Sequence, residues 1–118
     1  MKVLIIGAAG MIGRKLTSRL VRDGKLAGRA ITHAHLVDIV APQPSANAPF
    51  PIALDAFDIA APYVAPKLVA PRPDIVFLLA SVVSGEAEAD FDKGYAINLG
   101  GTHSIFEAIR REIGRAHV

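Results

Sequence analysis

The fold is decided by a stretch near the N-terminus in which an apolar run passes directly into a glycine-rich turn, Val3-Leu4-Ile5-Ile6-Gly7-Ala8-Ala9-Gly10-Met11-Ile12-Gly13. A short aliphatic run bounded by glycine is typical of a parallel β-strand that is covered on both faces. After the glycines, apolar residues recur at helical spacing as far as Leu26, which predicts a helix that Gly24 or Gly28 closes. The stretch therefore predicts a strand, a glycine turn and a helix in direct succession.

Strand and helix signals continue to alternate along the rest of the chain. Apolar runs predict strands over residues 35–40, 50–54 and 74–80, and helical spacing predicts helices over 62–70 and 89–114. Prolines exclude regular structure between 41 and 49, and Pro51 is tolerable only at an edge or at the start of a strand. The order β-α-β-β-α-β-α predicts an α/β fold, the N-terminal half of a Rossmann-type, doubly wound parallel sheet with right-handed crossovers.

The glycine turn has the spacing and the context of a dinucleotide-binding loop. Gly7 can form the tight turn out of the strand, Gly10 can let a pyrophosphate approach the backbone, and Gly13 can let the helix pack closely. Met11 and Ile12 begin the helix, whose N-terminal N–H groups and partial positive charge favour phosphate. The alternative is that the glycines form only a flexible turn.

A carboxylate at the end of the second predicted strand supports the dinucleotide interpretation. Asp38 lies 25 residues after Gly13, where an acidic side chain can accept hydrogen bonds from the adenosine ribose hydroxyls. It would repel a 2′-phosphate, so NAD is favoured over NADP. The alternative is that Asp38 is a solvated strand end.

Composition narrows the class of protein. The 118 residues carry a net charge of +2 without a basic block, so we expect one globular domain and neither a nucleic-acid nor a membrane partner. The absence of cysteine excludes disulfides and a thiol nucleophile. The apolar runs are shorter than a signal peptide or a membrane span requires, and we expect a cytoplasmic location. His33 and His35 share one face of a strand but lack further ligands, so no metal site is predicted.

The G-x-x-G-x-x-G form of the loop resembles the extended short-chain dehydrogenase/reductase family, which includes the NAD-dependent epimerases and dehydratases. The resemblance implies that Asp58 and Ile59 contact the adenine and that Ala80 and Ser81 lie beside the ribose and phosphates. Asn98 matches the family asparagine that begins the central helix and braces the active site. Residues 82–92 resemble the subgroup that contains D-erythronate dehydrogenase. Ile6 and Leu78 depart from the family pattern, in which a small residue and a histidine are usual.

The family's catalytic residues, a Ser or Thr after strand five and a Tyr-x-x-x-Lys helix, have no counterpart here, so we expect residues 1–118 to be an NAD(P)-binding domain truncated before them. Tyr63 and Lys67 have the spacing, but a proline separates them, and we interpret the match as accidental. No catalytic residue is therefore assigned, and whether the chain is itself an enzyme stays open.

Two functions follow from these interpretations. The first is the NAD-binding part of an oxidoreductase or epimerase acting on a sugar, sugar acid or nucleotide sugar. The second is a non-catalytic, truncated nucleotide-binding or assembly module, because the strand at 74–80 would form a bare apolar edge. In both cases we expect the chain to self-associate through that edge.

Overall fold

The structure, a computed structural model, describes residues 1–44, 47–79 and 101–116. The chain divides into two compact units. The sheet unit comprises residues 1–57 and 73–79, and the helix unit comprises residues 58–72 and 80–118, of which 58–72 and 101–116 are described. The expectation of one NAD(P)-binding domain stays a prediction.

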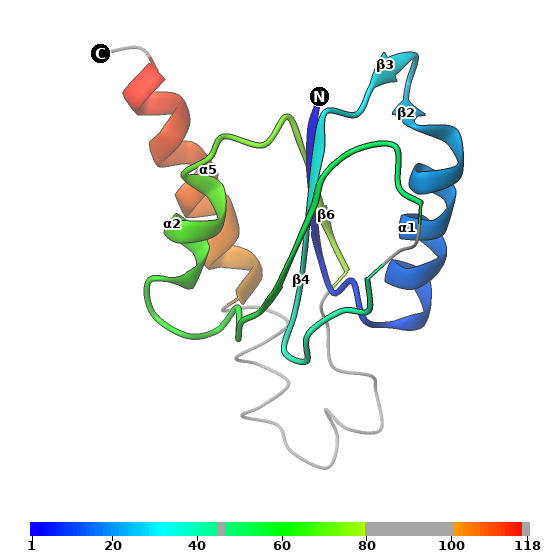
Figure 1. Ribbon diagram of the computed structural model, residues 1–118. Coiled ribbons are helices and arrows are strands. Elements are labelled where there is room, and N and C mark those ends of the chain that lie inside the picture. Colours follow the sequence, from blue (N-terminus) through cyan, green and yellow to red (C-terminus); the bar gives the residue numbers. More distant parts are fainter. Residues whose placement is uncertain (45–46, 80–100, 117–118) are drawn as a thin grey trace. The chain divides into compact units, whose positions relative to one another are not determined.

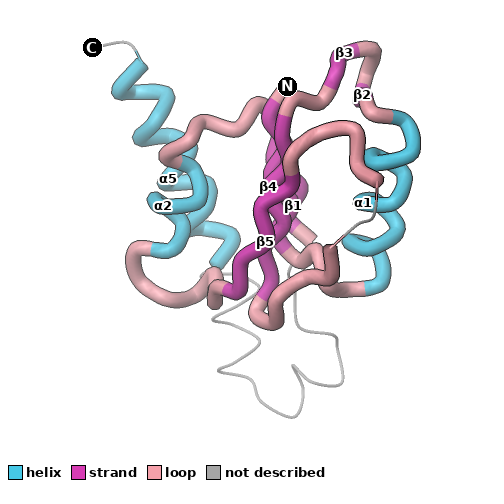
Figure 2. Tube along the Cα trace, in the orientation of Figure 1, coloured by secondary structure: helices cyan, strands magenta, loops and turns pink. Residues whose placement is uncertain are grey.

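The sheet unit is built on four parallel strands in the order β5-β4-β1-β6. Figures 1 and 2 show this sheet nearly edge-on. The bounds of the strands are β1 Lys2–Ile6, β4 His33–Asp38, β5 Ile52–Ala56 and β6 Ile75–Leu78. After β1 the chain forms β4 and then β5 on one side of β1, and it then crosses to form β6 on the other side. This arrangement confirms the predicted Rossmann-like, parallel α/β fold.

Strand β1 is buried on both faces. Val3 and Ile5 join a core with Leu20 of helix α1 (Met11–Asp23), which lies along one face of the sheet (Figure 1). The alternate side chains Leu4 and Ile6 are each 1% exposed. Burial of both faces is the physical reason for the uninterrupted aliphatic run in the sequence.

Helix α1 ends earlier than the outer limit of the prediction. Gly24 adopts a left-handed conformation with φ 68° and donates its N–H to Leu20 O at 2.8 Å, which caps the helix after Asp23. Gly28, the other predicted stop, lies instead in the turn between two short antiparallel strands, β2 (Lys25–Leu26) and β3 (Arg29–Ala30). The predicted helix as far as Leu26 was therefore too long.

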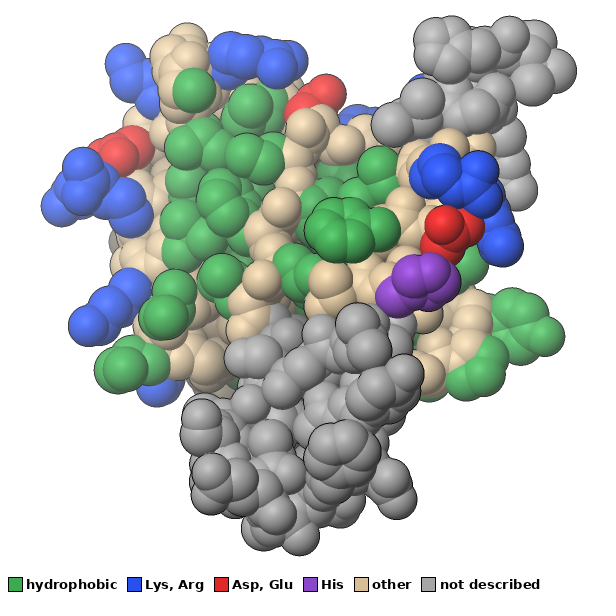
Figure 3. Space-filling view, turned by 180° about the vertical axis from the view of Figure 1, so that it is seen from behind, with side chains coloured by type: hydrophobic (Ala, Val, Ile, Leu, Met, Phe, Trp, Pro, Cys, Tyr) green, Lys and Arg blue, Asp and Glu red, His purple; other side chains and the backbone are tan. Residues whose placement is uncertain are grey.

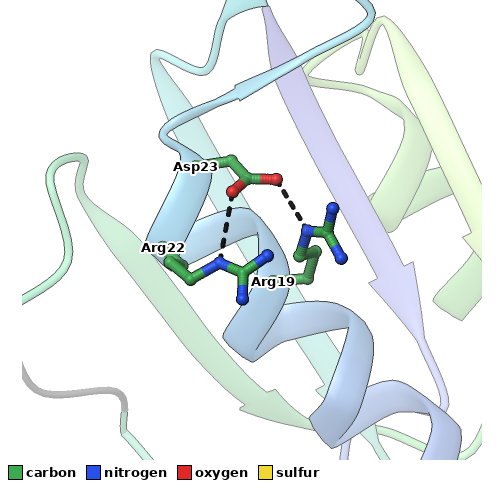
Figure 4. Close-up of polar contacts among 3 residues, drawn as sticks. All are labelled: Arg19, Arg22 and Asp23. Carbon is green, nitrogen blue, oxygen red and sulfur yellow. Dashed lines mark hydrogen bonds and ion pairs between the residues drawn. The ribbon is translucent and has the colours of Figure 1, made fainter.

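The last turn of α1 carries an exposed cluster of charges. The Asp23 carboxylate accepts a hydrogen bond from Arg19 Nε at 2.9 Å and another from Arg22 Nε at 3.4 Å (Figure 4). The hydrogen bond from Arg19 is the main cause that lowers the pKa of Asp23. Such exposed pairs add little to stability, so the helix depends mainly on its buried face.

The second and third predicted strands exist with shifted bounds. Strand β4 begins at His33 and ends at Asp38, so Ile39 and Val40 lie outside the strand. Strand β5 begins after Pro51, at the edge of the sheet, where proline was expected to be tolerated. His35 on β4 bonds Asp55 on β5, with Nε2 and Oδ2 2.7 Å apart. In the part of the chain that is described, no group of three potential ligands forms a metal site.

The described part of the helix unit contains α2 (Val64–Val69) and α5 (Thr102–Ala116), which pack against each other. Helix α2 begins two residues later than predicted, with Tyr63 as its exposed N-cap at φ 69°. The predicted helix over 89–114 is confirmed from residue 102, while residues 89–100 lie outside the described residues. Neither helix of this unit, nor α1, is long and apolar enough to cross a membrane.

Strand β6 forms the far edge of the sheet. It pairs with β1 on one side and has no strand partner on the other among the described residues. Residues 75–79 are all partly exposed, and Ile75, Phe77 and Leu79 pack on the core from this edge. Figure 3, which views the molecule from behind Figure 1, shows a broad area of hydrophobic side chains on this side. Within the described part of the chain, this edge of β6 is therefore apolar and partly exposed.

Candidate functional site

The candidate site lies where the neighbouring strands β1 and β4 end. Ile6 and Val37 are paired in register, so the loop after β1 and the last residue of β4, Asp38, reach the same edge of the sheet. Ligands of open parallel sheets bind at the carboxyl ends of the strands, where the direction of strand order reverses. The chain reverses here, because it moves from β1 toward β5 and then crosses to β6.

Gly7 makes the sharp turn that leads out of β1. Its φ of 96° belongs to a region that side chains disfavour. The N–H groups of Gly7 and Ala8 both donate to Val37 O, at 2.8 and 3.1 Å, and Gly10 donates to Gly7 O at 3.3 Å. The turn predicted at Gly7 is therefore present, and it is tied to β4.

Gly13 is required by packing within the chain. A Cβ at this position would lie 2.7 Å from Ala8 Cα and 2.9 Å from Ala8 C, and it would clash with Gly7 O. All of these atoms are backbone, so none can swing aside. The first turn of α1 can therefore approach the start of the loop only because residue 13 has no side chain.

Gly10 is different, because nothing inside the chain requires it. It is the N-cap of α1 with φ −73° and ψ 172°, an extended conformation open to any residue. A Cβ here would meet only Gly7 O, at an ordinary 3.5 Å. A side chain at position 10 would cause no strain within the chain, but it would cover the exposed surface in front of the helix.

The N-terminus of α1 is open and favours an anion. Gly10 offers no side-chain cap, the first turn has no acidic residue, and the first helical hydrogen bond runs from Arg14 N–H to Gly10 O at 2.9 Å. Met11 and Ile12 are 66% and 65% exposed. The N–H groups of this first turn and the helix dipole present partial positive charge to the solvent.

Asp38 lies against the glycine loop. Its Oδ2 accepts the Ala9 N–H at 2.9 Å and its Oδ1 accepts the Ile39 N–H at 2.7 Å. The side chain is half-buried, and each carboxylate oxygen keeps a further lone pair for a hydroxyl donor. Sequence reasoning placed Asp38 correctly at the strand end but missed its bond to Ala9.

Exposed apolar side chains follow Asp38 and the glycine loop in the sequence. Ile39 and Val40, directly after Asp38, are 62% and 68% exposed, and Met11 and Ile12 at the start of α1 are 66% and 65% exposed. These residues were assigned to a strand or to a helix face, so their exposure was missed. For Ile39 and Val40, the position directly after a strand end was the signal that could have revealed their exposure.

A hollow of about 180 Å³ lies in the sheet unit behind the loop. Its lining comes from the loop and α1, from the floor of the sheet, and from the proline-rich segment after β4, and consists of Ala8, Arg14, Thr17, Ser18, Leu36, Pro42, Gln43 and Pro44. Sequence reasoning missed it, because only the fold brings the proline-rich segment over α1.

The remaining predicted site residues belong to the helix unit or lie outside the described residues. Asp58 and Ile59 belong to the helix unit. Asp58 Oδ1 accepts the Ala60 N–H at 2.9 Å in a local turn, and Ile59 is 6% exposed. Ala80, Ser81 and Asn98 lie outside the described residues. The roles assigned to these five residues stay predictions.

Comparisons with known proteins agree with this geometry. The sequence model of the NAD dependent epimerase/dehydratase family matches residues 3–118. D-erythronate dehydrogenase of Cupriavidus necator is 39% identical over 118 residues, which cover 97% of this chain and 36% of that protein. A crystal structure described as the nucleoside-diphosphate-sugar epimerase from Agrobacterium tumefaciens is 52% identical with a TM-score of 0.94, over 98% of this chain and 34% of that one.

A more distant structure shares the fold. Uronate dehydrogenase from Agrobacterium tumefaciens, solved as a Y136A mutant complexed with NAD, is 23% identical with a TM-score of 0.73, over 93% of this chain and 36% of that one. The chain thus spans about a third of the length of the relatives it matches.

Proposed function

The chain belongs to the NAD dependent epimerase/dehydratase family, and we propose on this basis that it is the NAD-binding part of an oxidoreductase. The observation that carries the proposal is the meeting of the glycine loop, the open N-terminus of α1 and Asp38 at one edge of the sheet. Bound NAD would supply the hydride chemistry, and the described residues would bind and orient it.

The roles of the described residues follow from their geometry. The pyrophosphate would lie in front of Gly10, which provides no side-chain cap, at the first turn of α1 where Met11 and Ile12 are exposed. The ribose hydroxyls would donate to Asp38, and Gly7 and Gly13 would hold the loop against the sheet and the helix.

The other predicted contacts complete the proposal. We assign the adenine to Asp58 and Ile59, the ribose and phosphates to Ala80 and Ser81, and the brace of the active site to Asn98. In this proposal residues 1–118 form one NAD(P)-binding Rossmann domain. Catalytic residues are assigned to the part of the relatives that this chain does not span, and a cytoplasmic location belongs to the same proposal.

The substrate class is proposed from the relatives. D-erythronate dehydrogenase and uronate dehydrogenase are named for sugar acids, and the structure from Agrobacterium tumefaciens is named for nucleoside-diphosphate sugars. We propose a sugar, a sugar acid or a nucleotide sugar as the substrate of the whole protein.

The test is calorimetric titration of NAD and of NADP into the 118-residue chain. We expect saturable binding of NAD, and binding of NADP at least about tenfold weaker, because the Asp38 carboxylate repels a 2′-phosphate. Asp38→Ala should weaken NAD binding, whereas Asp55→Ala, which removes a carboxylate from the next strand, should not. A folded chain that binds neither dinucleotide would contradict the proposal.

A second proposal concerns self-association through β6. The edge of this strand is apolar, partly exposed and without a strand partner among the described residues, and such edges pair with other chains. Light scattering coupled to size-exclusion chromatography should show a species larger than a monomer at high protein concentration. Val76→Lys should shift the chain toward the monomer, and a wild-type monomer throughout the concentration series would contradict self-association.

A further inference from the structure

The backbone N–H groups of the glycine loop differ in their partners: those of Gly7 to Ala9 donate to β4, whereas that of Gly10 donates within the loop. The N–H groups of Gly7 and Ala8 are bound by Val37 O, and that of Ala9 is bound by the Asp38 carboxylate. Three consecutive loop donors are thus turned toward two consecutive residues of β4. Gly10 N–H is also used, by Gly7 O. The donors available to an anion are therefore those of the helix start, and the first half of the loop serves to place them.

Of the hydrogen bonds that join the loop to β4, the one from Ala9 N–H to the Asp38 carboxylate lies farthest along the loop. The two bonds to Val37 use a main-chain oxygen, which any residue would supply, whereas the bond to Ala9 depends on the side chain at position 38. Its length of 2.9 Å and the charge of its acceptor place it among the stronger hydrogen bonds. The tie from Gly10 to Gly7 is longer, at 3.3 Å, and stays within the loop.

We propose that Asp38 is a positioning residue for the glycine loop, in addition to its role toward the ribose. Its carboxylate fixes Ala9 and thereby sets the place of Gly10 and of the helix start that receives the pyrophosphate. The part of this inference that concerns pyrophosphate rests on the proposed function, whereas the part that concerns the loop does not.

The geometry also explains why an aspartate and not an asparagine is needed. Each carboxylate oxygen faces one backbone donor, Ala9 N–H or Ile39 N–H. A carboxamide has one oxygen and one NH₂ group, so one of the two backbone donors would face another donor. Asp38→Asn should therefore release either Ala9 N–H or Ile39 N–H although it preserves the shape of the side chain.

One consequence concerns cofactor preference. Replacing Asp38 removes the charge that repels a 2′-phosphate, but it also releases the loop that positions the phosphate site. A single substitution at this position should therefore reduce NAD binding without producing tight NADP binding. Preference for NADP would require a second change that restores an acceptor for Ala9 N–H.

The first experiment measures amide hydrogen exchange by NMR in the cofactor-free 118-residue chain. Asp38→Ala should accelerate exchange at Ala9 by about tenfold or more, and Asp38→Asn should accelerate exchange at Ala9 or at Ile39. The matched control is Asp74→Ala, which removes a carboxylate that accepts Lys2 N–H at 2.7 Å where β1 and β6 begin. It should leave Ala9 unchanged, and slow exchange at Leu4 would show that each variant is folded. Unchanged exchange at Ala9 in both Asp38 variants would overturn the proposal.

The second experiment titrates inorganic pyrophosphate, which has no ribose. If Asp38 acted only on the ribose, removal of its negative charge would leave pyrophosphate binding unchanged or strengthen it. The positioning role predicts the opposite sign, a loss of about fivefold or more in Asp38→Ala, with no loss in Asp74→Ala, which changes the net charge equally. Equal or tighter binding by Asp38→Ala would overturn the phosphate part of the inference. If wild type bound neither pyrophosphate nor NAD, the proposed function would fail, while Ala9 exchange would still decide the role in the loop.

Discussion

Gly13→Ala is expected to lower the free energy of unfolding by about 3 kcal/mol, a large part of the total stability of a domain of this size. The added methyl would lie 2.7 Å from Ala8 Cα and 2.9 Å from Ala8 C, and would clash with Gly7 O. Relief requires α1 to move away from the loop, which would open the core between Leu20 and β1. Urea unfolding followed by far-UV circular dichroism measures the effect.

Gly10→Ala is the matched control for that measurement. It adds the same methyl three residues earlier, where the nearest atom is Gly7 O at 3.5 Å and the backbone is extended. Its free energy of unfolding should change by less than about 1 kcal/mol, the usual scale for a change of N-cap residue. Equal destabilisation by the two substitutions would show that the glycines share a general need for flexibility and that the close approach at Gly13 is not decisive.

The sheet could be predicted from the sequence because its strands are physically distinctive. Strand β1 is buried on both faces from Val3 to Ile6 and is therefore apolar at each of these positions. The predicted strand began at His35, two residues after the start of β4, because His33 interrupts the apolar pattern. The partner that satisfies His35 is Asp55, 20 residues away, and no local rule predicts that pair.

The hairpin of β2 and β3 could not be separated from a helix end. Gly28 was interpreted as one of two possible helix stops, since glycine favours both a helix C-cap and a tight turn. In the structure Gly24 takes the first role with φ 68°, and Ala27 and Gly28 form the turn with φ 51° and 78°. Strands of two residues carry no periodic signal that would reveal the difference.

The sequence predicted the glycine loop and Asp38 as parts of the candidate site, but it did not predict the hydrogen bond that joins them. The sequence indicates that the glycine loop and Asp38 each follow a strand, and parallel pairing of those strands brings them to one edge. It does not show that the carboxylate binds Ala9, because that bond depends on the register of Ile6 with Val37. Nor does it distinguish Gly10 from Gly13, since only the atoms around each one decide whether a side chain would fit.

Gly10→Val is expected to reduce NAD affinity by about a hundredfold while the chain stays folded. The substitution is compatible with the extended backbone at this position, where a Cβ has room. In the proposed complex, however, its methyl groups would occupy the space in front of the helix N-terminus and keep the pyrophosphate from the N–H groups of Met11 and Ile12. Loss of one hydrogen bond to a charged group costs about 1.5–3 kcal/mol, and each 1.4 kcal/mol is about tenfold in affinity.

Calorimetry with NAD measures this effect, and Ser18→Val is the matched control, because Ser18 is an exposed residue of α1 two turns beyond Gly10. Both variants should keep the wild-type far-UV spectrum and unfold within about 1 kcal/mol of wild type. Only Gly10→Val should lose NAD. If Gly10→Val bound NAD as wild type does, the pyrophosphate could not lie at the N-terminus of α1, and the open surface there would need another ligand. If it lost NAD while retaining its stability, the absence of a side chain at Gly10 would be explained by the ligand and not by the fold.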